Sequence, residues 1–185
     1  MSYYKKMTGK KVFLSPVSAN DKTVESYTKW LNDRAVTDNL ATSHYQNSSF
    51  SEKKWIESEL ENGGCQYSIV TLEDNRLVGH VGLEELCHIN RVATVGIFIG
   101  ESEDRGKGYG GEALKLMLEY CFGVLNLNNV MLKVLPFNKT AKALYEKLGF
   151  REFGRRRGAY YLNNLYHDII HMDITREEWY KNGSD

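Results

Sequence analysis

A short glycine-rich segment, residues 105–111, constrains the fold of this chain more than any other feature. It reads Arg-Gly-Lys-Gly-Tyr-Gly-Gly, so four of the 16 glycines fall within six positions, where uniform scatter would place about half of one. Glycine clusters where the backbone must bend freely or approach a ligand closely. The segment opens a helix with an apolar stripe along residues 113–121. Free N–H groups and the helix dipole meet there, and Arg105 and Lys107 add positive charge. We therefore predict a site for an anion such as phosphate.

Two common phosphate motifs do not explain this segment. Gly106, Gly108 and Gly111 match the spacing of the dinucleotide fingerprint, but residues 101–104 separate them from the preceding strand. The acidic residue that should end the next strand is also missing. A nucleotide P-loop needs Ser or Thr after Gly-Lys, and Gly108 stands there instead. A glycine-rich connector without a ligand is the remaining alternative.

The apolar patterns predict an α+β fold with a mixed sheet. The order is one strand, two helices, three strands, helix, strand, helix and two strands, which is neither pure alternation nor segregation. Ser18 and the pair Ser49 and Glu52 are expected to cap the first two helices. The expected strands are 11–17, 67–72, 77–85, 93–100, 130–135, 150–161 and 166–174, and the four helices begin near residues 21, 49, 109 and 138.

Composition limits the classes of protein to consider. A length of 185 residues with 42% apolar residues fits one domain, 1–185, with its core at about 10–175. Lys and Arg number 24, as do Asp and Glu, so a dedicated nucleic-acid binder is not expected. Three separated cysteines exclude a disulfide scaffold and fit a reducing compartment. We find no signal peptide or apolar span, and we expect a cytoplasmic protein without a membrane partner.

The glycine-rich segment is one of several motifs that resemble the GNAT N-acetyltransferases. The sequence of these motifs is most similar to the branch that contains ribosomal-protein N-terminal acetyltransferases and spermidine acetyltransferases. The resemblance covers roughly residues 10–175 and implies a sheet that is splayed at its centre, with about seven strands and four flanking helices. The motifs that carry it, in family order, are residues 78–83, 96–100, 105–113, 121–127, 138–150 and 166–172.

The same resemblance implies acetyl-CoA as the acetyl donor and assigns residues to it. Backbone N–H groups of the glycine-rich segment would hold the CoA pyrophosphate, and the end of the preceding strand would pair with the pantetheine arm. The implied residues are Phe98, Ile99, Arg105, Gly106, Lys107, Gly108, Tyr109, Gly110, Gly111 and Asn138. Tyr145, seven residues after Asn138 and on the same helix side, would lie near the thioester sulfur.

Transfer to an amine requires a proton acceptor and a proton donor. The resemblance makes Tyr145 the donor; on the helix pattern alone it is an aromatic core residue. Glu84 and Glu85 are the first candidates for the base, although either could simply be a solvated strand end. Strict alternation along the strand places His80 and Glu84 on one face and Glu85 on the other. His80 and His88 are further candidates for the base, because histidine titrates in the right range.

The remaining candidates are weaker. The run of residues 155–157, all arginine, is expected to be a solvated edge strand. Trp30, Tyr45 and Trp55 lie in the region that shapes the acceptor pocket in the resembled family. No spacing predicts a metal site.

The leading hypothesis is an acetyl-CoA-dependent N-acetyltransferase that acts on a primary amine, either a protein N-terminus or a small molecule. A polyamine or antibiotic-type amine is the alternative acceptor. A non-catalytic acyl-CoA-binding module is the alternative of another class. A homodimer is possible by the same resemblance.

Overall fold

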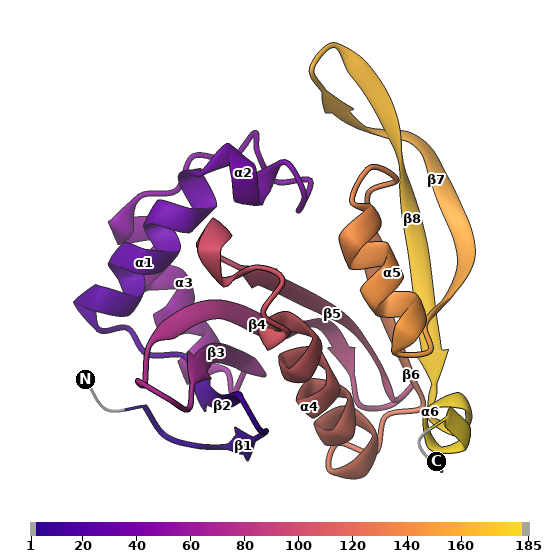
Figure 1. Ribbon diagram of the computed structural model, residues 1–185, viewed down its shortest axis with the longest axis horizontal. Coiled ribbons are helices and arrows are strands. Elements are labelled where there is room, and N and C mark those ends of the chain that lie inside the picture. The colour runs from indigo at the N-terminus through magenta and orange to yellow at the C-terminus, as the bar shows by residue number, and fades with distance from the viewer. Residues whose placement is uncertain (1–2, 183–185) are drawn as a thin grey trace.

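The computed structural model describes residues 3–182 as one mixed sheet flanked by helices (Figure 1). The strands are β1 (Met7–Thr8), β2 (Val12–Pro16), β3 (Gln66–Thr71), β4 (Leu77–Cys87), β5 (Val92–Ile99), β6 (Asn129–Val134), β7 (Arg151–Leu162) and β8 (Leu165–Thr175). The helices are α1 (Asp21–Asn32), α2 (Arg34–Thr37), α3 (Ser49–Glu61), α4 (Tyr109–Gly123), α5 (Lys139–Lys147) and α6 (Arg176–Asn182), with a 3₁₀ turn at Ser102–Asp104.

The expected α+β class with a mixed sheet is confirmed. The strand order is β1-β2-β3-β4-β5-β6-β8-β7, and only β5 and β6 run parallel. The described residues form eight strands and six α-helices, where the sequence predicted about seven and four. The additional elements are β1, α2 and α6, of two, four and seven residues. Elements this short carry too little periodicity to be seen in a sequence.

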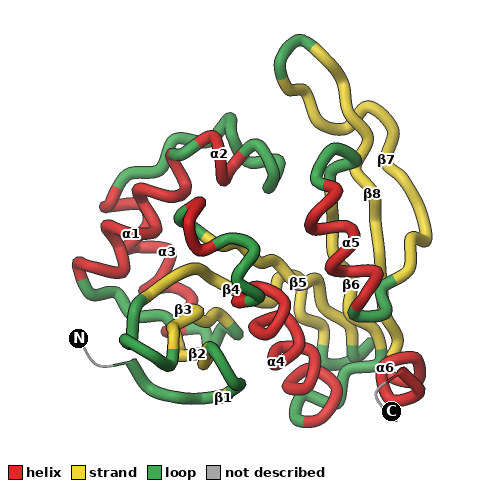
Figure 2. The backbone as a smooth tube through the Cα atoms, in the orientation of Figure 1, coloured by secondary structure: helices red, strands yellow, loops and turns green. Residues whose placement is uncertain are grey.

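The sheet opens at its centre, between β5 and β6. Only Val92, Ala93 and Thr94 of β5 pair with β6, whereas β5 pairs with β4 as far as Ile99. Residues 95–99 therefore keep a free edge toward β6, and the two strands separate as Figure 2 shows. The splay that the resemblance implied is present.

Two apolar clusters cover the two faces of the sheet. On one face α4 packs across β2 to β5, and Ala113, Leu114 and Met117 are fully buried, as the apolar stripe predicted. On the other face a smaller cluster joins α1 and α3 to Phe98 through Tyr27 and Ile56, among others. The strand β5 is apolar on both faces because it separates the two clusters.

Two expected helix caps are wrong by one or two residues. Asn20, not Ser18, caps α1 by accepting a hydrogen bond from the Thr23 amide at 3.0 Å. Ser48 and Ser51 form the capping box of α3, not Ser49 and Glu52. Each error is a choice between polar residues that are close neighbours and fit the same motif. Glu52 takes no part in the cap, and its side chain is buried.

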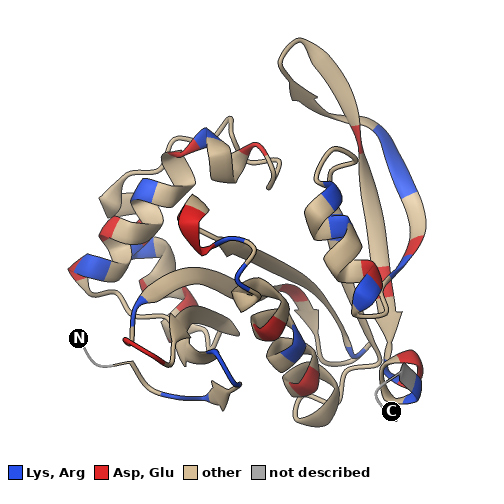
Figure 3. Ribbon diagram, in the orientation of Figure 1, with Lys and Arg blue, Asp and Glu red and all other residues tan. Residues whose placement is uncertain are grey.

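The outer strand β7 carries the arginine run of residues 155–157, visible as a blue band in Figure 3. All three side chains are exposed, and Arg155 pairs with Glu152. The pairing with β8 shifts register twice along β7. Charges and irregular pairing are typical of an edge strand that resists further strand addition, so the expectation of a solvated edge is confirmed.

Candidate active site

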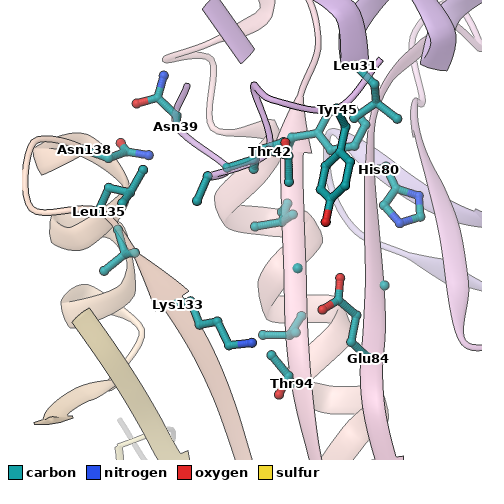
Figure 4. A pocket seen from close by; sticks show the side chains of 18 of the residues that line it. Leu31, Asn39, Thr42, Tyr45, His80, Glu84, Thr94, Lys133, Leu135 and Asn138 are labelled. Carbon is teal, nitrogen blue, oxygen red and sulfur yellow. The ribbon is translucent and has the colours of Figure 1, made fainter. Parts of the chain in front are cut away.

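A cavity of about 410 Å³ occupies the opening between β5 and β6. Its walls are residues 94–98 of β5, the end of β6 with the start of α5, and the inner side of α1 and α3. The loop between α2 and α3 adds Leu40, Thr42 and Tyr45 to the lining. Figure 4 shows Thr42 and Tyr45 at the upper end of the cavity. The cavity thus joins the free edge of β5 to the helices on the second face of the sheet.

Tyr145 lines this cavity from α5 and is 8% exposed. Burial raises the pKa of its phenol to about 12, because the phenolate would lose hydration. The hydroxyl is therefore protonated at neutral pH. Asn138, at the other end of the same helix side, also lines the cavity, while its Oδ1 caps α5 at the Ala141 amide. The structure brings the two residues to one wall, and Tyr145 can act there as a proton donor.

The glycine-rich loop presents unpaired backbone donors at the start of α4. Gly108 is the N-cap with φ of +87°, and no side chain caps the helix. Within the described residues, the N–H groups of residues 106–111 have no hydrogen-bond acceptor. Such a set of converging amides is suited to an anion.

The charged side chains around the loop mostly hold it in place. The Arg105 guanidinium donates to the carbonyls of Gly100 at 2.9 Å, Ala35 at 3.2 Å and Ile99 at 3.4 Å. Its charge is therefore directed at the backbone and not at the loop amides. Lys107 pairs with the buried Asp104, whose pKa is lowered by hydrogen bonds from Arg76.

Lys11, which the sequence analysis did not single out, contacts the loop at the start of α4. The Nζ of Lys11, from the turn before β2, donates to the Lys107 carbonyl at 2.8 Å. The same turn is held by Glu112 of α4, whose carboxylate accepts from the amides of Lys10, Lys11 and Val12 at 2.7–2.8 Å. These long-range contacts have no local sequence signal.

The two candidate glutamates take different positions. Glu84 lines the cavity, and its Oε1 lies 3.7 Å from where a Cβ on Gly96 of β5 would stand. Glu85 has φ of +52° at an irregularity of the β4–β5 pairing, and its Oε2 accepts from Thr94 Oγ1 at 2.8 Å. Strict alternation placed Glu85 on the opposite face from Glu84. That prediction is wrong, because the bulge turns the Glu85 carboxylate back to Thr94.

His80 is fixed in a buried network and is not available as a base. Gln66 donates through Nε2 to the Leu83 carbonyl, so its Oε1 must accept the proton of His80 Nε2 at 3.0 Å. The Nδ1 then accepts from the Tyr27 hydroxyl at 3.3 Å. Burial lowers the pKa of His80 to about 4. Both ring nitrogens are engaged, and His80 instead stacks on Phe98 of β5.

The other sequence candidates separate into lining and non-lining residues. Tyr45 and Trp55 line the cavity, whereas Trp30 is buried in the core and donates to Glu101 at 2.8 Å. His88 lies in a neighbouring polar hollow of about 640 Å³, which also contains Glu59 and Glu85. The described residues contain no group of His, Cys, Asp or Glu suited to hold a metal ion. None of their helices is long and apolar enough to cross a membrane.

Glu52 and Lys133 are charged cavity residues that the sequence analysis did not assign to the site. Glu52 is 5% exposed, and burial raises the pKa of its carboxyl to about 7. The available signal was its place four residues before the buried Ile56, which puts both on the inner face of α3. The sequence analysis assigned Glu52 to the cap of α3 instead, and therefore did not place it in the cavity wall.

Comparison with known proteins identifies the family. Residues 11–151 match the family model for the acetyltransferase (GNAT) domain. The chain belongs to the GNAT acetyltransferase family. The resemblance inferred from the motifs is thereby confirmed, together with the enzyme class of the matched domain, an N-acetyltransferase that uses acetyl-CoA.

Individual relatives agree with this family. A putative ribosomal N-acetyltransferase YdaF of Bacillus subtilis is 33% identical over 58% of each chain. A spermidine N(1)-acetyltransferase of Vibrio cholerae is 33% identical over 60% of this chain and 64% of its own. The aligned segments thus span about three fifths of these relatives. The crystal structure of a V. cholerae spermidine N-acetyltransferase with CoA and spermine has a TM-score of 0.83 at 24% identity, covering 91% of this chain and 98% of that one.

Proposed function

We propose that this chain transfers the acetyl group of acetyl-CoA to a primary amine, with the cavity as its active site. The observation that carries the proposal is the pair Tyr145 and Glu84. They reach one cavity from α5 and from β4, on the two sides of the opened sheet. A protonated phenol and a carboxylate at one opening are the two partners that amine acylation needs.

Two features of the backbone fit acetyl-CoA. The free edge of β5 offers the backbone groups of Ile97 and Ile99 to the amides of a pantetheine arm, although the Ile99 carbonyl also accepts from Arg105. The expectation for the Phe98 backbone is wrong, because Phe98 lies opposite His80 in the hydrogen-bonded pairing with β4. The unpaired amides of residues 106–111 at the start of α4 suit the pyrophosphate. Lys107 and Lys11 add charge there, and Arg105 holds the loop in shape.

The proposed roles follow from the protonation states. Acetyl-CoA supplies a thioester carbonyl, which an amine attacks only in its neutral form. Glu84, directly or through a water, takes one proton from the incoming ammonium, whose usual pKa is about 10. As the new C–N bond forms and the C–S bond breaks, Tyr145 gives its proton to the departing sulfur. The second amine proton restores the phenol, so one proton in total is released. Backbone amides of β5 would stabilise the carbonyl oxygen.

The acceptor enters from the α1–α3 side of the cavity in this proposal. A protein N-terminus and a small amine are both consistent with it, and the spermidine acetyltransferase among the relatives supports the polyamine alternative. Glu59, Glu84 and Glu85 around the neighbouring hollow would favour a cationic acceptor. The expected homodimer and the cytoplasmic location stay predictions.

Thiol release from acetyl-CoA in the presence of a panel of amines tests the proposal. The panel should hold peptide N-termini, polyamines, amino sugars and simple alkylamines. We expect release that depends on the amine, with the acetylated product identified by mass. Tight CoA binding in calorimetry without turnover on any amine would instead support the acyl-CoA-binding module.

A further inference from the structure

Glu52 is a buried acidic residue with no hydrogen-bond partner for its Oε1 in the described part of the chain. That oxygen is inaccessible to solvent. Because Ser48 and Ser51 already complete the cap of α3, the helix start does not need this side chain. An unpaired buried acidic group is normally removed or paired, since burial disfavours its charge strongly. Glu52 also lines the cavity, so a ligand bound there can supply a partner to this side chain.

The surroundings of Glu52 define the chemistry of that partner. Glu52 stands three residues before Trp55 on α3, and the Trp55 ring lies 5.7 Å from the His80 ring, so Glu52 lies near the His80 level of β4. The cavity walls nearby are Tyr27, Leu31 and Trp55. Aromatic and aliphatic walls around one carboxylate suit an ammonium group on a methylene chain.

The other charged groups of the cavity lie further along the sheet. Glu84 stands four residues beyond His80 on β4, which is about 13 Å of strand. Its carboxylate shortens this span by reaching over Gly96. Lys133 faces the same end as Glu84, and their side chains point into one space in Figure 4. Glu52 and Glu84 thus lie at two different levels of one cavity. The cationic side chain of the cavity wall, Lys133, lies at the level of Glu84.

We propose that Glu52 binds a second ammonium group of the acceptor, so that the site selects a flexible diamine or polyamine over a monoamine or a protein N-terminus. This inference rests on the proposed function. Glu84 receives the amine that reacts, and Glu52 fixes the distant nitrogen, with the methylenes between them against the aromatic walls. A protein N-terminus or a monoamine brings one ammonium group to the cavity and would leave Glu52 without a cationic partner.

The test compares 1,4-diaminobutane with n-butylamine, which share a carbon chain and differ by one ammonium group. We expect the unmodified chain to prefer the diamine in kcat/KM by about tenfold or more. Glu52→Gln should reduce that preference to about twofold, mainly by raising KM for the diamine. Glu57→Gln, on the exposed side of the same helix, is the matched control and should retain the preference.

The outcomes separate this inference from the proposed function. Turnover with both amines and an undiminished diamine preference in Glu52→Gln would overturn the role of Glu52 and leave the acetyltransferase intact. Absence of turnover with every amine would overturn the proposed function. In that case, calorimetry of 1,4-diaminobutane with the CoA-saturated chain tests whether Glu52 binds an ammonium group, independently of turnover. Binding that Glu52→Gln abolishes supports the site, and equal binding in both proteins contradicts it.

Discussion

Tyr145 and Glu52 line the same cavity, and burial raises the pKa of both, with different consequences. For Tyr145 the raised pKa does not change the protonation state at neutral pH, because an ordinary phenol is also protonated there. For Glu52 it moves titration into the neutral range, where a bound cation would restore the charged form. One residue is thus poised as a donor, and the other as an ion site that is unfavourable when empty.

Replacement of Tyr145 by Phe removes the proposed proton donor with little change in volume. We expect kcat to fall by about 10²-fold or more, while KM for acetyl-CoA stays within about twofold. Thiol-release kinetics at neutral pH measure both. Tyr166→Phe, at an exposed position on β8, is the matched control. An unchanged kcat in Tyr145→Phe would remove the proposed role.

Glu52→Gln should stabilise the free protein, and only at higher pH. The folded pKa of about 7 exceeds the ordinary value of 4.5. The protonated carboxyl therefore favours the folded state at low pH, and this contribution is lost as pH rises through 7. At pH 8 the substitution should raise the free energy of unfolding by about 1–3 kcal/mol, with little change at pH 5. Thermal unfolding at the two pH values measures this, with Glu57→Gln as control. An equal effect at both pH values would contradict it.

At the scale of elements, long periodic segments were predictable and local irregularities were not. The stripe of α4 and the two-sided apolar pattern of β5 follow from burial, which the sequence records directly. The face of Glu85 was predicted wrongly because a bulge depends on pairing with β5. The same limit applies to Lys11 and Glu112, whose contacts join segments about 100 residues apart.

The start of α4 depends on a conformation that glycine adopts most readily. Gly108 has φ of +87°, and an added Cβ would lie 3.3 Å from the Nζ of Lys11. Gly108→Ala should destabilise the fold by about 1–2 kcal/mol. It should also weaken CoA binding by about tenfold, because the loop amides no longer converge. Calorimetry gives the CoA affinity. Gly123→Ala, at the other end of α4 with open space around its Cβ, should keep that affinity. Similar losses in both variants would contradict a specific role for the loop.

For the whole molecule, the opened sheet divides the chain into two halves that meet at the base of the cavity. Three residue pairs of β5 and β6 join them there. At the far side the β7–β8 hairpin reaches the region of α2, where the Tyr160 hydroxyl lies 2.6 Å from Ser43 Oγ and Arg34 donates to Asn163 at 3.1 Å. Between these two connections the edge of β5 is free. A ligand that fills the gap would therefore complete the sheet.

This arrangement predicts how amide hydrogen exchange responds to two ligands. CoA should slow exchange within residues 95–99, at the Ile97 and Ile99 amides that face the free edge, and in residues 106–111, because the pantetheine arm pairs with β5 and the pyrophosphate binds the loop. The nucleotide half alone, 3′-phospho-ADP, should protect only residues 106–111. The strand β3, paired on both sides, is the internal control and should not respond to either ligand. Protection of residues 95–99 by the nucleotide half would mean that closure of the two halves, and not pairing with the arm, orders this edge. Absence of protection there with CoA would place the thioester elsewhere, and the roles of Tyr145 and Glu84 would fail with it.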